Sequence, residues 1–162
     1  MILVGEPHPE FPIEPMIRSM GLSANVRVLG FTPIEDFVGY LGACDIVLNL
    51  RYPTVGESSG TLLRSLVLGK AVLVSEVGSF QEFPDDVCLK VPVGAGEEDL
   101  IFEYLNLLVS RPEVAQALGA RARTYVAEQC NWAAVARQYA GFLESVVTGK
   151  EWEVAETKPT ER

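Results

Sequence analysis

The sequence has few of the residues that build metal sites and disulfide frameworks. Its 162 residues include one histidine, His8, and three cysteines, Cys44, Cys88 and Cys130, which lie far apart in the chain. No Cys-x-x-Cys pair is present, so the sequence predicts neither a structural zinc site nor a disulfide framework. The cysteines are interpreted as free thiols of a reducing compartment, and the chain is predicted to be cytoplasmic. We also predict that it binds no metal and no other cofactor.

Basic residues and long apolar runs are scarce as well. Thirteen lysines and arginines stand against twenty-two aspartates and glutamates, which gives a net charge of −9. A nucleic-acid-binding protein needs a positive surface, so this class is disfavoured, and so is docking on an anionic membrane face. No apolar run reaches the ~20 residues that span a bilayer, and residues 1–4 are too short an apolar start for a signal peptide. An anionic ligand must therefore be held locally, by backbone N–H groups and one or two selected cations.

What the sequence does contain is an alternation of short apolar runs with helical patterns. Strands are predicted at residues 2–4, 26–29, 45–49, 71–75 and 87–91, and helices at residues 12–20, 33–43, 59–68, 97–109, 114–126 and 132–146. Short apolar strands separated by helices indicate βαβ units and a parallel sheet. We therefore predict an α/β fold: a three-layer α/β/α Rossmann-like domain with a mostly parallel sheet over residues 1–148. Residues 149–162 are predicted to be a loose tail.

The last three predicted helices each carry apolar residues at helical spacing. In the final one, Trp132, Tyr139 and Phe142 lie on a stripe that continues over four turns. We predict that all three stripes pack into the core. Replacing Trp132 with alanine would then lower stability by the ~3–5 kcal/mol typical of a buried tryptophan.

The most informative segment, residues 52–70, connects a buried parallel strand to the start of a helix. In open α/β sheets, ligands bind at this carboxyl edge of the strands. The predicted helix start contains Ser58, Ser59, Gly60 and Thr61. Unpaired N–H groups and the positive end of the helix dipole make such a start suitable for a phosphate or diphosphate. The same serines also suit an ordinary capped helix, and the spacing alone leaves both interpretations open.

Two charged residues accompany this predicted anion site. A carboxylate is repelled by phosphate, so Glu57 is predicted to address neutral hydroxyl groups of a sugar beyond the phosphate; the alternative is that it only favours the helix dipole. The positive charge of Arg64 is unfavourable near the positive end of that dipole unless an anion lies nearby. The anion is either a ligand phosphate or Glu57 itself. Thr61, Arg64, Ser65 and Leu68 are predicted to share one face of the helix. The opposite side is predicted to be core and consists of Leu62, Leu63, Leu66 and Val67.

This order of motifs resembles the C-terminal domain of family 4 glycosyltransferases. The family pattern has an acidic residue followed after two residues by a glycine, and Glu57 and Gly60 match this part. Residues 69–75 match the strand that follows, and residues 77–82 resemble the Gly-Gly-x-x-Glu turn of the family. The strand over residues 26–31 resembles the one whose end lies near the nucleotide base. With residues 45–48 and the closing helix at 132–136, the similarity extends over about residues 1–145.

The resemblance implies a retaining glycosyltransferase of GT-B architecture, of which this chain is the half that binds the nucleotide-sugar donor. Glu57 is then the catalytic residue, which orients the sugar. The residues that contact the donor are Ser58, Ser59, Gly60, Thr61, Arg64, Ser65, Gly30, Phe31 and Glu82. For Glu82, capping of its own turn is the alternative role.

The sequence departs from the family pattern in two ways. Ser65 stands where the family has a second acidic residue, so only a weaker hydrogen bond to the ribose is predicted there. This keeps open the alternative of a non-catalytic sugar-nucleotide-binding module or a degenerate paralogue. The strand and helix that open the family domain are missing, as is the N-terminal acceptor-binding domain. We expect that domain of the same enzyme to be the partner, to make any peripheral membrane contact, and to be required for activity.

Overall fold

The computed structural model describes residues 1–152, which divide into two compact units. The first unit is Met1–Ala43, and the second begins at Cys44. The prediction of one domain over residues 1–148 stays a prediction. The last helix, predicted over residues 132–146, extends to Thr148, and most of the predicted tail lies outside the described residues.

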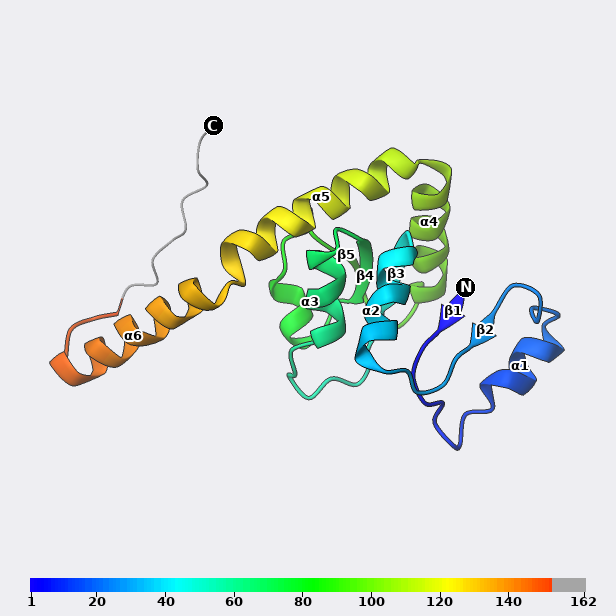
Figure 1. The fold of residues 1–162 in the computed structure, drawn as a ribbon, viewed down its shortest axis with the longest axis horizontal. Helices are drawn as coiled ribbons and strands as arrows, with labels where there is room; N and C mark the ends of the chain where they lie inside the picture. Colours follow the sequence, from blue (N-terminus) through cyan, green and yellow to red (C-terminus); the bar gives the residue numbers. More distant parts are fainter. Residues whose placement is uncertain (153–162) are drawn as a thin grey trace. The chain divides into compact units, whose positions relative to one another are not determined.

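The first unit contains two short parallel strands and two helices. In chain order they are β1 (Ile2–Leu3), α1 (Ile13–Ser19), β2 (Arg27–Val28) and α2 (Ile34–Ala43), as labelled in Figure 1. Ile2 lies opposite Arg27 in the parallel register. Beyond the strands, the Gly5 N–H donates to the Gly30 carbonyl oxygen at 2.9 Å, which joins the two loops that follow β1 and β2.

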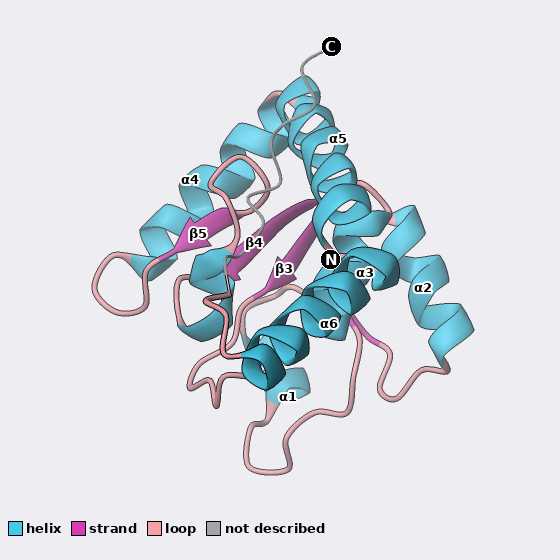
Figure 2. Ribbon diagram, turned by 90° about the vertical axis from the view of Figure 1, so that its left-hand side faces the viewer, coloured by secondary structure: helices cyan, strands magenta, loops and turns pink. Residues whose placement is uncertain are grey.

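The second unit is built on a parallel sheet with strand order β3-β4-β5. Its elements are β3 (Ile46–Asn49), α3 (Gly60–Val67), β4 (Ala71–Ser75), the 3₁₀ helix η1 (Gly78–Glu82), β5 (Leu89–Val91), α4 (Glu97–Ser110), α5 (Pro112–Gln129) and α6 (Trp132–Thr148). The strands lie between α3 and α4 in both ribbon views (Figures 1 and 2). The predicted α/β fold with parallel strands is therefore confirmed.

The central strand β4 explains why its sequence is uniformly apolar rather than alternating. All five of its residues are buried, because helices cover both faces of the sheet. Ala71 and Leu73 form one core cluster with Val91 of β5 and Leu108 of α4. Each large side chain buried in this way contributes about 1.5–3 kcal/mol.

Helix α5 fixes the end of α3. Gly119 of α5 lies so close to the carbonyl oxygen of Gly69, in the turn between α3 and β4, that a Cβ at this position would not fit. One turn later, Nη2 of Arg123 donates to the carbonyl oxygen of Leu68, the C-cap of α3, at 3.1 Å. Gly69 itself has a φ of 68°, the left-handed conformation that ends helices at glycine. These contacts with α5 thus fix the position of α3 at its C-terminal end, away from its N-terminus.

The last helix differs from its prediction. No residue of α6 is buried, and the Trp132 side chain is 89% exposed. Tyr139 and Phe142, on the same apolar stripe, are exposed as well. The prediction that this stripe packs into the core of the chain is wrong, because helical spacing of apolar residues shows that a helix has an apolar face but not what covers it. By contrast, α4 and α5 do supply buried residues.

Candidate functional site

The start of α3 leaves two backbone donors unused. Ser59 is the N-cap: its backbone is extended, and its Oγ accepts a hydrogen bond from the Leu62 N–H at 3.2 Å. The Leu63 N–H donates to the Ser59 carbonyl oxygen. Within residues 1–152, the N–H groups of Gly60 and Thr61 donate to no protein acceptor. These two donors point along the helix axis at its N-terminal end, the geometry that binds anions.

The guanidinium group of Arg64 lies over this same helix end. Arg64 is in the second half of the eight-residue helix, but helical side chains lean toward the N-terminus, and a Cβ placed on Gly60 would lie 2.7 Å from Nη1 of Arg64. The absence of a side chain at Gly60 therefore provides the space that the guanidinium occupies. Arg64 is exposed, and no carboxylate in the described part of the chain pairs with it.

The charge at this helix start differs from that of four other helices in the described part of the chain. Helices α1, α2, α4 and α5 all have acidic residues in their first turn, where a carboxylate stabilises the positive end of the dipole. Helices α3 and α6 have none. In a protein of net charge −9, the first turn of α3 thus has no carboxylate, and a guanidinium group lies over it. Such a combination of positive charge and backbone N–H groups suits an anionic ligand.

Glu57 is held by the loop that precedes the helix. Its Oε2 accepts hydrogen bonds from the Thr54 hydroxyl at 2.8 Å and from the Val55 N–H at 2.9 Å, and Nη1 of Arg51 lies 3.8 Å from its Oε1. The predicted alternative that Glu57 is the partner of Arg64 is therefore wrong, because Glu57 pairs with Arg51 instead. The N–H of Glu57 itself, then the Thr54 hydroxyl, the Val55 N–H and the charge of Arg51 together lower the pKa of Glu57 from its ordinary value. The carboxylate is consequently an ionised, partly exposed acceptor.

A buried polar layer anchors this loop to the ends of two strands. At the loop's end, Ser59 Oγ donates to Oδ1 of Asn49, the last residue of β3, at 3.1 Å. At its beginning, the Arg51 N–H donates to Oγ of Ser75, the last residue of β4, at 2.9 Å. Asn49, Ser59 and Ser75 are all at least 95% buried. Nδ2 of Asn49 has no hydrogen-bond partner among the described residues.

The sequence analysis missed the residues that hold this loop, namely Asn49, Arg51, Thr54 and Ser75. One signal was available in the sequence. Asn49 and Ser75 are polar residues that end otherwise apolar strands, and such residues lie at the carboxyl edge of the sheet. The bonds from Thr54 and Arg51 to Glu57 depend on the path of the loop, which no periodicity reports.

The other predicted site residues are found in different environments. Ser58 is exposed beside the helix start, and Glu82 is exposed at the end of η1. Ser65 is fully buried, and its hydroxyl donates to the Thr61 carbonyl oxygen at 2.8 Å. The predicted division of the helix into a core face and an opposite face is wrong at two positions: Ser65, predicted opposite the core, is inside, and Val67, predicted to be core, is 53% exposed. A contact between Ser65 and a ligand stays a prediction.

The predicted base-binding residues Gly30 and Phe31 belong to the first unit. Phe31 is 78% exposed, and the Gly30 carbonyl oxygen accepts the bond from Gly5 described above. The arrangement of these residues within their own unit leaves the Phe31 ring available to a ligand. Their contact with a nucleotide base stays a prediction.

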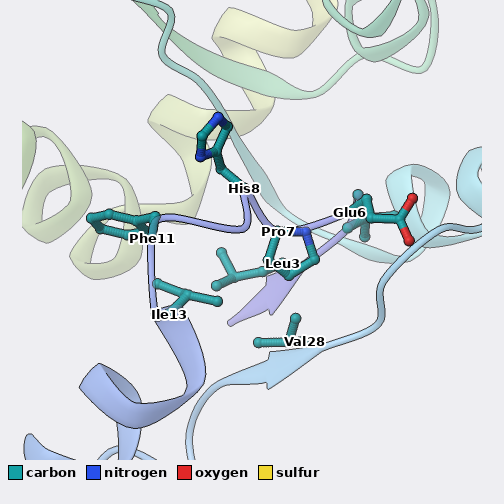
Figure 3. Close-up of a pocket in the computed structure, with 9 residues that line it drawn as sticks. Leu3, Glu6, Pro7, His8, Phe11, Ile13 and Val28 are labelled. Carbon is teal, nitrogen blue, oxygen red and sulfur yellow. The ribbon is translucent and has the colours of Figure 1, made fainter.

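The first unit also has an open pocket of about 200 Å³ beside β1, drawn in Figure 3. Apolar side chains from both strands and from α1 line it, and those of Leu3 and Ile13 point toward one another. The Glu6 carboxylate and the His8 ring point away from them. None of the predicted site residues lines this pocket.

Among the described residues, no three His, Cys, Asp or Glu side chains are grouped so that they would hold a metal ion. Within the same residues, none of the helices has the length and apolar character needed to cross a membrane.

Comparison with known proteins relates the chain to glycosyltransferase structures. No family model matches the chain, and no curated protein matches its sequence. Sucrose-phosphate synthase from Thermosynechococcus elongatus superposes with a TM-score of 0.70 at 22% identity, covering 91% of this chain and 38% of that protein. Anabaena HepE in complex with UDP-glucose gives a TM-score of 0.74 at 20% identity, covering 89% of this chain and 40% of that protein.

A third structure is a single domain. The C-terminal domain of the group 1 family glycosyl transferase LpcC from Francisella tularensis has a TM-score of 0.66 at 19% identity, with 81% of this chain and 69% of that domain covered. The chain spans about two fifths of the length of the two larger proteins. At these identities the likeness establishes the architecture: the chain has the α/β fold of the Rossmann-like domains of GT-B glycosyltransferases.

Proposed function

We propose that this chain is the donor-binding domain of a glycosyltransferase and that it recognises a nucleoside-diphosphate sugar. The observation that carries the proposal is the start of α3, where the free N–H groups of Gly60 and Thr61 meet the guanidinium group of Arg64. Such a site suits a diphosphate. The HepE structures, which share this fold, were determined in complex with UDP and with UDP-glucose, which supports a ligand of this class.

The proposed chemistry is electrostatic. When the bond between the sugar and the diphosphate breaks, negative charge builds up on the departing diphosphate, and the two N–H groups and Arg64 stabilise it. Glu57 is ionised, and Thr54 and Val55 occupy only its Oε2. Its Oε1, to which Arg51 is the nearest cation at 3.8 Å, accepts hydrogen bonds from sugar hydroxyls.

The finer proposal concerns the intact enzyme. We infer that the chain is the C-terminal half of a retaining, cytoplasmic GT-B enzyme of family 4 and that the acceptor is held by an N-terminal domain of the same protein. Transfer then requires both halves, because the two reactants must be held together. No metal or other cofactor is part of the proposal. Further donor contacts are assigned to Ser58 and Glu82, whereas contacts of Ser59, Ser65, Gly30 and Phe31 with the donor stay predictions.

Titration calorimetry on the full-length protein tests the function. The probes are UDP, GDP and ADP and their glucose or mannose esters. Arg64→Gln is expected to weaken the nucleoside diphosphate and the sugar nucleotide alike. Glu57→Gln is expected to spare the diphosphate and to weaken the sugar nucleotide by the ~1.5–3 kcal/mol of a hydrogen bond to a charged group. Glu98→Gln, at the exposed start of α4, is the matched control and should change neither affinity.

Two results would contradict the proposal. If no probe binds the wild-type protein, the nucleotide-sugar function is wrong. If Glu57→Gln weakens UDP and its sugar ester equally, the assignment of Glu57 to the sugar is wrong while the diphosphate site stands.

A non-catalytic sugar-nucleotide-binding module is the second candidate, and the environment of Ser65 favours it. The hydroxyl at this position is buried and bonded within the helix, where a family 4 enzyme has an acidic residue. Incubating the full-length protein with labelled donors and a panel of acceptors separates the two functions. Binding without any glycoside product would identify the module, and sustained product formation would identify the enzyme.

A further inference from the structure

Thr54 makes the hydrogen bonds that shape the carboxylate end of the loop. Its hydroxyl donates to Oε2 of Glu57 at 2.8 Å and accepts from the Gly56 N–H at 3.1 Å. Among the described residues, Thr54 is the side chain that hydrogen-bonds the Glu57 carboxylate. The guanidinium of Arg51, at 3.8 Å and 41% exposed, is too far away to form such a bond.

The other side of Thr54 rests against the turn that follows β4. A Cβ placed on Gly78 would lie 2.9 Å from the Thr54 methyl carbon and 3.2 Å from its Oγ1, so the side chain packs directly against the glycine backbone. In the same turn, Ser79 Oγ donates to the Glu57 carbonyl oxygen at 2.8 Å. Because a β-branched side chain has few χ1 options, this packing fixes the direction of the Thr54 hydroxyl.

Glu57 is therefore held at both ends, its main chain by Ser79 and its carboxylate by Thr54. A glutamate side chain without contacts to the rest of the protein loses rotamer freedom when it binds a ligand, and this loss weakens binding. A carboxylate that is already fixed avoids most of that loss. The bond from Thr54 engages Oε2 and leaves Oε1 for a ligand.

We propose that Thr54 is a positioning residue, which orients the Glu57 carboxylate toward the sugar and so sets the preference for a sugar nucleotide over the free nucleoside diphosphate. This inference rests on the proposed function, in which Glu57 addresses the sugar. Thr54 contacts neither sugar nor phosphate, but it determines how strongly the site prefers a sugar nucleotide to a nucleoside diphosphate.

Two substitutions of Thr54 and one at a remote position test this role in the full-length protein. Thr54→Val keeps the shape that packs on Gly78 and removes the hydroxyl, whereas Thr54→Ser keeps the hydroxyl. Thr124→Val, a hydroxyl removed from an exposed position of α5, is the remote control. The affinities for UDP and UDP-glucose are measured by calorimetry, and the pKa of Glu57 by NMR titration of its carboxyl carbon. If UDP does not bind the wild-type protein, UDP and UDP-glucose are replaced by whichever nucleoside diphosphate and sugar ester among the GDP and ADP probes does bind.

Thr54→Val is expected to bind the sugar nucleotide about tenfold more weakly, to bind the diphosphate as before and to show a raised Glu57 pKa. Thr54→Ser and Thr124→Val should match the wild type in all three. Equal changes for both ligands, or no change in their ratio, would overturn the role of Thr54. If the wild-type protein binds the nucleoside diphosphate and the sugar nucleotide with equal affinity, the assignment of Glu57 to the sugar is itself wrong. Should Thr54→Val not fold, Thr54→Ala, which cannot crowd Gly78, is measured in the same way.

Discussion

Two arginines lie at opposite ends of α3, and their removal should change stability in opposite directions. The guanidinium of Arg64 lies over the N-terminal end at Gly60, whereas that of Arg123 donates to the carbonyl oxygen of Leu68 at the C-terminal end. A cation is unfavourable near the positive end of a helix dipole and favourable near the negative end. In the protein without ligand, Arg64→Gln should therefore raise stability and Arg123→Gln should lower it.

The size of each effect follows from the exposure of these groups. Both arginines are exposed, so the dipole contribution is about 0.3–1 kcal/mol in each case. Arg123→Gln also loses a hydrogen bond, which adds about 0.5–1.5 kcal/mol to its deficit. The two variants should differ by about 1–3.5 kcal/mol, or about 2–14 °C in Tm for a chain of this size. Urea unfolding at low salt measures the difference, and added salt should shrink the dipole part of it.

A bound ligand reverses the effect of Arg64→Gln. A ligand that binds only the folded state raises its stability in proportion to the logarithm of its concentration over Kd. At saturating UDP the wild type should gain more than Arg64→Gln and become the more stable of the two. If Arg64→Gln instead destabilises the protein without ligand by as much as Arg123→Gln does, Arg64 is a structural contact and the anion site is misassigned.

Three further predictions concern packing, the last helix and pH. Gly119→Ala should cost about 3 kcal/mol, the upper end of the overpacking range, because a Cβ there meets the Gly69 carbonyl. Gly39→Ala, in open space on α2, should instead gain about 0.5–1 kcal/mol in urea unfolding. Trp132→Ala should change the free energy of unfolding of this chain by no more than the roughly 0.5 kcal/mol of surface substitutions, contrary to the expectation from the sequence. A larger loss of stability in urea unfolding would show that α6 is covered. The lowered pKa of Glu57 adds stability that is present above the ordinary glutamate pKa and is lost as the pH falls through the folded value. Glu57→Gln should therefore flatten the acid part of the stability curve measured by urea unfolding, and an unchanged curve would show that the carboxylate is not held as described.

The elements of the second unit could be predicted because local signals mark them. Strand β4 was predicted at residues 71–75, where it is found, since a strand buried on both faces is an uninterrupted apolar run. Helix α3 was predicted at residues 59–68 and is found at Gly60–Val67, with Ser59 as its N-cap and Gly69 in the left-handed conformation that ends helices. These features are encoded within a few residues of where they act.

The errors arose where the answer depends on distant parts of the chain. Which face of α3 is buried depends on how α5 and the sheet pack around it, so Ser65 is inside and Val67 outside. The partner of Glu57 depends on a loop path that brings Thr54 and Arg51 to it. Helical periodicity of α6 correctly indicated a helix but carried no information about its neighbours.

The two unused donors at the start of α3 belong to the backbone, and this affects how the site is able to change during evolution. Substituting a side chain does not remove an N–H group, so the Gly60 and Thr61 donors persist under nearly any replacement, and only proline deletes one. The charged and apolar side chains around them are then free to vary while the helix start retains its affinity for anions. This also means that changes in ligand preference would be acquired through the loop before the helix rather than through the helix itself.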